Sequence, residues 1–75
     1  MKKSFEEIEA IVNKHTNGTS GWRVTIRQKG IPDVCGDSSL GNLAGYIFNL
    51  QNGYPKAEFL VEGIYSWNNN IMFWI

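Results

Sequence analysis

The chain has very few of the side chains that hold metals or act as nucleophiles: one cysteine, Cys35, and one histidine, His15, among 75 residues. A single cysteine excludes a disulfide within the chain, and a structural zinc site needs about four clustered ligands. A Cys–His nucleophile needs both groups within hydrogen-bond reach. Because His15 falls in a helical pattern and Cys35 in an apolar stretch, we expect no catalytic residue, no metal site, no cofactor and no enzymatic activity.

An excess of charge of one sign is also lacking, because seven basic residues balance seven acidic ones. A neutral chain has no overall field that attracts nucleic acid or anionic lipid, so neither is an expected partner. The longest apolar run, residues 71–75, is too short to span a bilayer, and the charged N-terminal residues do not form a secretory signal. Together with the lone cysteine, these features predict a cytoplasmic protein.

Asp33 and Asp37 are the nearest approach to a carboxylate pair or a metal site. The roles we expect for them are structural: a turn residue at Asp33 and a helix N-cap at Asp37. No nucleotide-binding glycine pattern, metalloprotease motif or calcium-binding loop occurs.

The chain does contain enough apolar material for a core, since hydrophobic residues make up 43% of it and aromatic residues 13%. Its length suits one domain, which we assign to residues 1–75. A domain of this size buries only about 60% of its unfolded surface, so its stability is marginal. Without a disulfide or a metal, good packing or self-association must supply the rest.

Two segments have helical periodicity. The first opens with the capping box Ser4–Phe5–Glu6–Glu7 and is predicted to end at Asn17–Gly18. Its apolar stripe comprises Phe5, Ile8, Ile11, Val12 and His15. The second is predicted to start from an N-cap at Asp37 or Ser38 and to end at Asn52–Gly53. Its stripe comprises Leu40, Leu43, Ala44, Ile47 and Leu50.

Gly41 and Gly45 share one side of the second predicted helix. Each weakens a helix by roughly 1 kcal/mol relative to alanine. We expect them to allow close packing on the sheet, with a ligand contact as the alternative.

Four further segments are typical of strands. Residues 22–28 alternate between apolar and polar side chains. Residues 34–36 follow a turn at residues 29–33, which contains Gly, Pro and Asp, and are predicted to form a short return strand. Residues 58–66 and 71–75 form a hairpin with a tight turn at Asn68–Asn69. The order α-β-(β)-α-β-β predicts an α+β fold of two layers, a small antiparallel sheet with both helices on one face.

The final predicted hairpin is apolar on both faces, whereas a sheet with helices on one side should be polar on the other. A second copy of the chain, a different protein, or a planar ligand such as a nucleotide could cover that face. We expect a homodimer or a larger protein partner. Residues 71–75 carry no charge or proline, so as an edge strand they would invite pairing with another chain. The predicted interface residues are Leu60, Ile64, Trp67, Met72 and Trp74.

Arg23, Arg27 and Lys29 form a basic stripe on the polar side of the first strand. With Trp22 alongside, they could receive a phosphate and a stacked base. The alternative is that the arginines pair with Glu58 or Glu62 on a neighbouring strand.

Residues 30–40, GIPDVCGDSSL, resemble the hairpin-to-helix segment of HicB-type antitoxins, which combines a Pro-Asp turn with a G-D-[ST]-L helix start. The likeness omits that family's leading strand and DNA-binding tail, and we transfer no function from it. The short form without enzyme motifs also resembles small accessory or inhibitor proteins of phages and mobile elements.

These observations predict a small protein-interaction module that self-associates, with an accessory or inhibitor role as one form of that function. The first alternative is a small-ligand, nucleotide-like binder that uses aromatic residues with Arg23 or Arg27. The second is a weak nucleic-acid-binding or antitoxin-like module.

Overall fold

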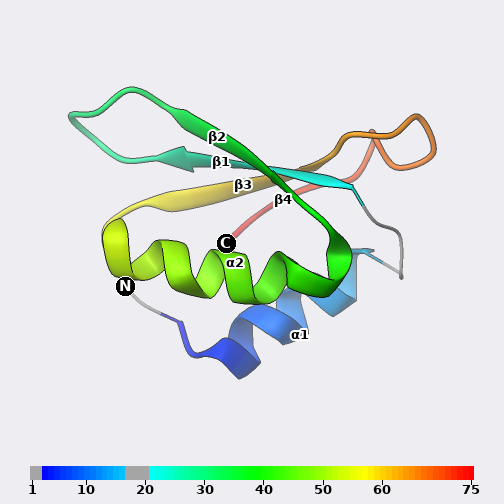
Figure 1. Ribbon diagram of the computed structural model, residues 1–75, viewed down its shortest axis with the longest axis horizontal. Helices are drawn as coiled ribbons and strands as arrows, with labels where there is room; N and C mark the ends of the chain where they lie inside the picture. Colours follow the sequence, from blue (N-terminus) through cyan, green and yellow to red (C-terminus); the bar gives the residue numbers. More distant parts are fainter. Residues whose placement is uncertain (1–2, 17–20) are drawn as a thin grey trace.

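A computed structural model of the chain describes residues 3–16 and 21–75, with two helices and four strands (Figure 1). The elements are α1 (Phe5–Thr16), β1 (Trp22–Arg27), β2 (Val34–Ser38), α2 (Leu40–Gly53), β3 (Glu58–Gly63) and β4 (Met72–Trp74). The predicted α+β class and element order are confirmed. The short return strand forms and extends to Ser38, whereas the predicted helix end at Asn17–Gly18 lies outside the described residues.

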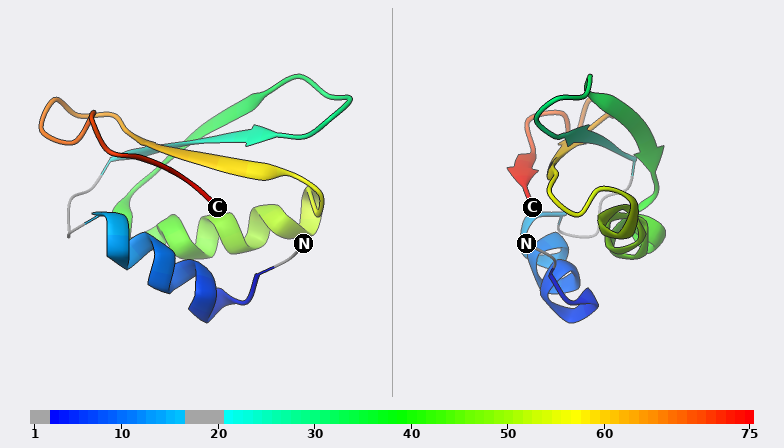
Figure 2. Two further views of the ribbon diagram at one scale, coloured as in Figure 1. Left: turned by 180° about the vertical axis from the view of Figure 1, so that it is seen from behind. Right: turned by 90° about the vertical axis from the view of Figure 1, so that its left-hand side faces the viewer.

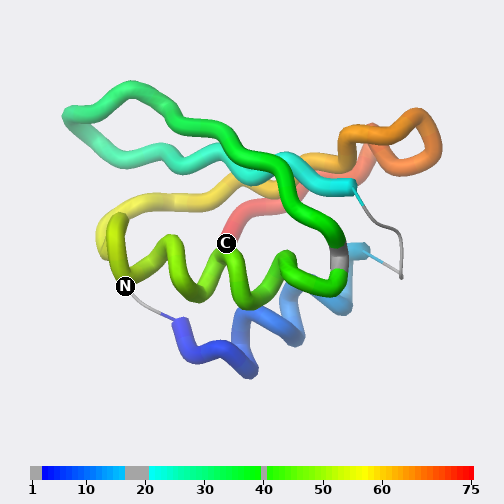
Figure 3. Tube along the Cα trace, in the orientation of Figure 1, coloured from blue at the N-terminus to red at the C-terminus, as the bar shows by residue number. Residues whose placement is uncertain are grey.

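The four strands form one antiparallel sheet in the order β2-β1-β3-β4, so β2 and β4 are its edges. Both helices lie on the same face of this sheet, which we call the inner face, and the views in Figure 2 show the outer face without a covering layer. The tip of the β1–β2 hairpin and the loop of residues 64–71 project at opposite ends of the molecule (Figure 3).

The core lies between the inner face and the helices. Because side chains alternate along a strand, Trp22, Val24 and Ile26 of β1 all point inward and are buried. The core comprises Ile8, Val12, Trp22, Val24, Ile26, Leu43, Ile47, Phe59, Val61 and Phe73. Trp22 meets Phe73 edge-on with ring centroids 6.4 Å apart. Full burial of one such side chain stabilises a fold by about 1.5–3 kcal/mol.

Helix α1 begins as its capping box predicts. The Glu7 backbone N–H donates to Ser4 Oγ at 3.2 Å, and the Ser4 N–H donates to Glu7 Oε1 at 3.2 Å. The helix buries Ile8, Val12 and Thr16, and His15 stacks on Phe73 with ring centroids 4.4 Å apart, which sets α1 against β4. Phe5 belongs to the predicted stripe but is exposed, and its ring meets Phe48 of α2 edge-on.

Helix α2 starts later than predicted. Its N-cap is Ser39, which makes no side-chain cap hydrogen bond, so the predicted cap at Asp37 or Ser38 is wrong. Both residues instead lie in β2, where they pair with β1. The end of α2 at Gly53 agrees with the prediction, and the Tyr54 N–H donates to the Leu50 carbonyl at 2.8 Å. In the predicted stripe Leu43 and Ile47 are buried and Ala44 and Leu50 half-buried, while the side chain of Leu40 lies outside the described part.

The predicted tight turn at Asn68–Asn69 is right in part, because a hydrogen-bonded turn runs from Asn68 to Ile71. This turn belongs to a longer connection between β3 and β4, residues 64–71, that is organised around the buried Asn68 amide. Asn68 Oδ1 accepts a hydrogen bond from the Tyr65 N–H at 2.8 Å. Asn68 Nδ2 donates to the Gly21 carbonyl at 3.3 Å. Its own carbonyl accepts from the Ile71 N–H at 3.0 Å. One side chain therefore holds the loop against the start of β1.

We predict that Gly63→Ala destabilises the protein by about 1–3 kcal/mol, the usual cost of forcing an extra group into a packed site. A Cβ at this position would overlap the backbone carbonyl of Asn68. Gly45→Ala is the matched control, since nothing lies within 4 Å of a Cβ there. It should stabilise α2 by about 0.5–1 kcal/mol. Urea unfolding of both variants measures the difference, and equal midpoints for the two would contradict the role of Gly63.

Candidate functional site

The outer face of the sheet changes character from one edge to the other. Strand register sets two rows of outward side chains across the four strands. One row is Asp37, Arg23, Glu62 and Met72; the next is Cys35, Thr25, Leu60 and Trp74. Each row is polar or small at β2 and apolar at β4. The candidate site is therefore the β4 side of this face.

We define the β4 surface as the outer-face residues Leu60, Met72 and Trp74. The predicted interface residue Ile64 lies elsewhere, with Tyr65, beside Gly21 and residues 37–39 at the end of β2. Trp67 is 68% exposed, Met72 57% and Trp74 45%. Ile64 is also exposed and Leu60 is half-buried. The Tyr65 and Trp67 rings stack with centroids 4.7 Å apart. Apolar side chains of this size in water mark an interaction surface when they gather in one region.

Arg27 lies against the Trp74 ring, with its Cζ 5.5 Å from the ring centroid. Its guanidinium also forms a fork with Asp33, in which Nη2 lies 2.7 Å and Nε 3.2 Å from Oδ2. This hydrogen bond lowers the pKa of Asp33, and Asp33 in turn raises the pKa of Arg27. A guanidinium held in this way favours one position of the indole, so Trp74 is exposed but oriented.

The predicted grouping of Trp22 with Arg23 and Arg27 does not form. Trp22 is fully buried on the inner face, and both arginines point outward. Arg23 Nε pairs with Asp37 Oδ1 at 3.1 Å, while Arg27 pairs with Asp33. Each guanidinium is thus paired with an aspartate at the β2 side of the sheet, and neither lies beside Trp22.

The predicted alternative was that these arginines pair with Glu58 or Glu62. It is correct for the strand register but not for the ion pairs. The register sets Arg27 opposite Glu58 and Arg23 opposite Glu62 across the β1–β3 ladder. The ion pairs among the described residues run the other way, to aspartates at the β2 edge. With four carboxylates around two guanidiniums, this face is acidic overall.

Cys35 and His15 lie at opposite edges of the sheet. Cys35 is exposed on β2, with Sγ 3.4 Å from Thr25 Oγ1, and His15 stacks on Phe73 of β4. Strands β1 and β3 separate them, so the two do not form a dyad. Within the described ranges, no three His, Cys, Asp or Glu residues cluster as metal ligands, and neither helix has the length and apolarity to cross a bilayer.

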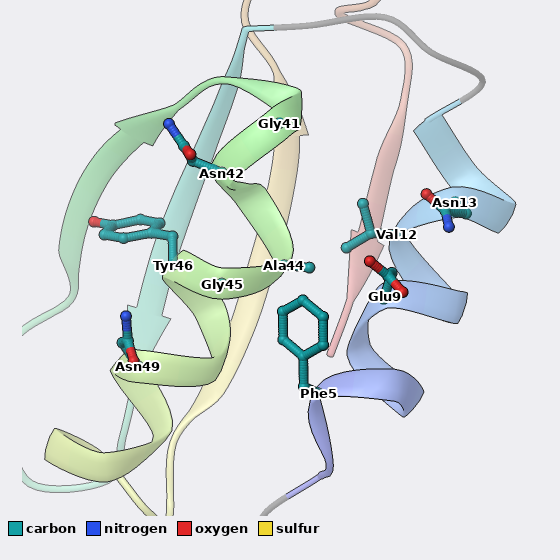
Figure 4. A pocket seen from close by; sticks show the side chains of 10 residues that line it. All are labelled: Phe5, Glu9, Val12, Asn13, Gly41, Asn42, Ala44, Gly45, Tyr46 and Asn49. Atoms are coloured by element: carbon teal, nitrogen blue, oxygen red, sulfur yellow. The ribbon is translucent and has the colours of Figure 1, made fainter.

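A second surface feature is a groove of about 460 Å³ between α1 and α2 (Figure 4). A Cβ at Gly41 or Gly45 would meet no atom within 4 Å, so the predicted close packing of these glycines on the sheet is wrong. Both instead line the open groove. Figure 4 shows Phe5 and Ala44 between the helices, whereas Tyr46 points away on the far side of α2. The polar residues that line the groove are Glu9, Asn13, Asn42 and Asn49.

No family model, curated protein or solved structure matches the chain. The resemblance of residues 30–40 to HicB-type antitoxins is accordingly a local one. Its hairpin does lead into a helix, which begins at Leu40. Function must therefore be argued from the surface of this chain.

We predict that the Asp33 carboxyl titrates below the usual aspartate range because Arg27 favours its charged form. A lowered folded-state pKa stabilises the fold above the unfolded value of about 3.9, and this contribution is lost as the pH falls through the lower folded value. NMR titration of the side-chain carboxyl measures the midpoint. Arg27→Met should return it to the usual range, and Arg23→Met should leave it unchanged. A midpoint unaffected by Arg27→Met would exclude this pair as the cause.

Proposed function

We propose that this protein is a self-associating interaction module and that two copies meet at the β4 surface. The observation that carries the proposal is the exposure of Met72 and Trp74 on an edge strand. Small domains without disulfides or metals commonly gain stability from a partner chain, and most such assemblies are two-fold symmetric.

The exposed area suits a reversible dimer. A tryptophan side chain offers about 150–250 Å² to an interface. At 45% exposure, Trp74 leaves on the order of 100 Å² per copy in water. Met72 roughly doubles this, so the side chains of two copies bury on the order of 400 Å², which is the range of weak contacts and not of permanent interfaces. We therefore expect association only at high protein concentration.

Electrostatics favours a second copy over a nucleotide or nucleic acid. The β4 surface has no charged side chain, so two copies can approach without like-charge repulsion. The outer face beside it is acidic, with Asp33, Asp37, Glu58 and Glu62 around two paired arginines. Phosphate groups are repelled by such a face. The two alternative functions therefore have less support.

We predict that Met72→Lys weakens the dimer by about 30-fold or more, because each of two symmetric contacts loses an apolar group and gains a buried charge. The substitution suits the isolated fold, since Met72 lies opposite Glu62 across the β3–β4 ladder. Sedimentation velocity over a concentration series measures the effect. The unmodified chain should shift from 8.5 kDa to twice that mass.

Val34→Lys is the control for this prediction. Val34 is an exposed apolar residue on β2, at the opposite edge of the sheet. This variant should dimerise as the unmodified chain does. An unmodified chain that stays at 8.5 kDa up to millimolar concentration would overturn the proposal. Equal weakening of the dimer by Met72→Lys and Val34→Lys would also overturn it.

A further inference from the structure

The backbone of β4 directs alternate residues to opposite sides. Phe59 and Ile75 exchange both N–H···O bonds, at 2.9 and 2.8 Å, and the Gly63 N–H donates to the Ile71 carbonyl at 3.0 Å. In an antiparallel ladder the residues between such pairs direct their N–H and C=O groups the other way. Met72 and Trp74 therefore present theirs to the free edge, where β4 has no neighbouring strand within the described residues.

The two edges of the sheet differ in how they are protected against pairing with another chain. At β2, Asp37 lies within the strand and Asp33 directly precedes it, each in an ion pair. Charged side chains and prolines are the usual means of blocking an edge. Residues 71–75 contain neither. Of the two edges, β4 is the one open to strand addition.

We propose that the two copies join by antiparallel pairing of β4 with β4 of the second copy, about a two-fold axis at Phe73. This inference rests on the proposed self-association and specifies how it occurs. The axis sets Met72 of each copy opposite Trp74 of the other copy. Both residues have outward N–H and C=O groups, so each pair can exchange two backbone hydrogen bonds. The product is one continuous sheet of both copies.

The side chains favour the same register. On the outer face, Trp74 would lie beside Met72 of the second copy, and sulfur–aromatic contacts of this kind are favourable. The exposed ring is already held in place from the other side by Arg27. Both side chains that the pairing covers are apolar, and the neighbouring charges are of both signs, since Arg27 lies against Trp74 and Glu62 lies opposite Met72.

Cysteine cross-linking tests this register. In a Cys35→Ser background, Met72→Cys and Trp74→Cys proteins are prepared separately and oxidised with glutathione disulfide, alone and mixed. Directly opposite residues have Cα atoms about 5.5 Å apart, within reach of a disulfide. The Met72 residues of the two copies are two residues out of register and more than about 7 Å apart, so a disulfide cannot join cysteines at these positions. We expect at least about tenfold more covalent dimer in the mixture than with either protein alone.

A backbone variant tests strand addition separately from side-chain contacts. Met72→Pro and Met72→Ala both remove the thioether, but only proline removes the N–H that points to the free edge. Proline is tolerated at an outward position of an edge strand, and circular dichroism verifies that the fold is retained. The proline variant should weaken the dimer by about tenfold more than the alanine variant, since two hydrogen bonds are lost by symmetry.

The outcomes separate this inference from the proposed function. Preferential cross-linking in the mixture, together with the proline effect, supports edge pairing. If the Cys35→Ser protein dimerises but the Met72→Cys and Trp74→Cys proteins cross-link like with like, or not at all in the mixture, edge pairing is overturned and self-association is left intact. Equal effects of proline and alanine also overturn it. A Cys35→Ser protein that stays monomeric over the concentration series overturns both.

Discussion

Two short helices are able to cover only one face of a four-stranded sheet, and most features of this molecule follow from that constraint. The inner face gathers Trp22, Phe59 and Phe73 against α1 and α2. The outer face must meet water, and over β1 and β2 it does so with ion pairs. Over β4 it does not. On the outer face, the ion pairs lie over β1 and β2, and the exposed side chains of Met72 and Trp74 lie over β4.

Local periodicity was sufficient to predict most of the fold. The capping box at Ser4 and the alternation of Trp22, Val24 and Ile26 each specify one structure without reference to the rest of the chain. Predictions failed where a distant residue decides the outcome. Asp37 does not cap α2, because its backbone pairs in β2 and its carboxylate bonds to Arg23. The turn at Asn68 is part of a longer connection than predicted, in which its amide bonds to Gly21, 47 residues away.

The candidate site was predictable in part for the same reason. Two apolar faces on one hairpin can be seen in the sequence, and the side chains so identified are exposed or half-buried. The Arg27–Trp74 contact depends on the order of strands in the sheet, which alternation does not provide. The signal that separates Trp22 from Arg23 was present, since neighbours in a strand point to opposite faces. Their proximity in sequence was given more weight than that alternation.

The stacking of His15 on Phe73 has a consequence for how the molecule is made. It ties the first helix to the strand that is synthesised after all the others, and the central pairing of β1 with β3 also joins distant segments. Contacts of high sequence separation require large loops to close, which slows folding. A nascent chain that still lacks β4 therefore leaves part of the cover over Trp22 missing.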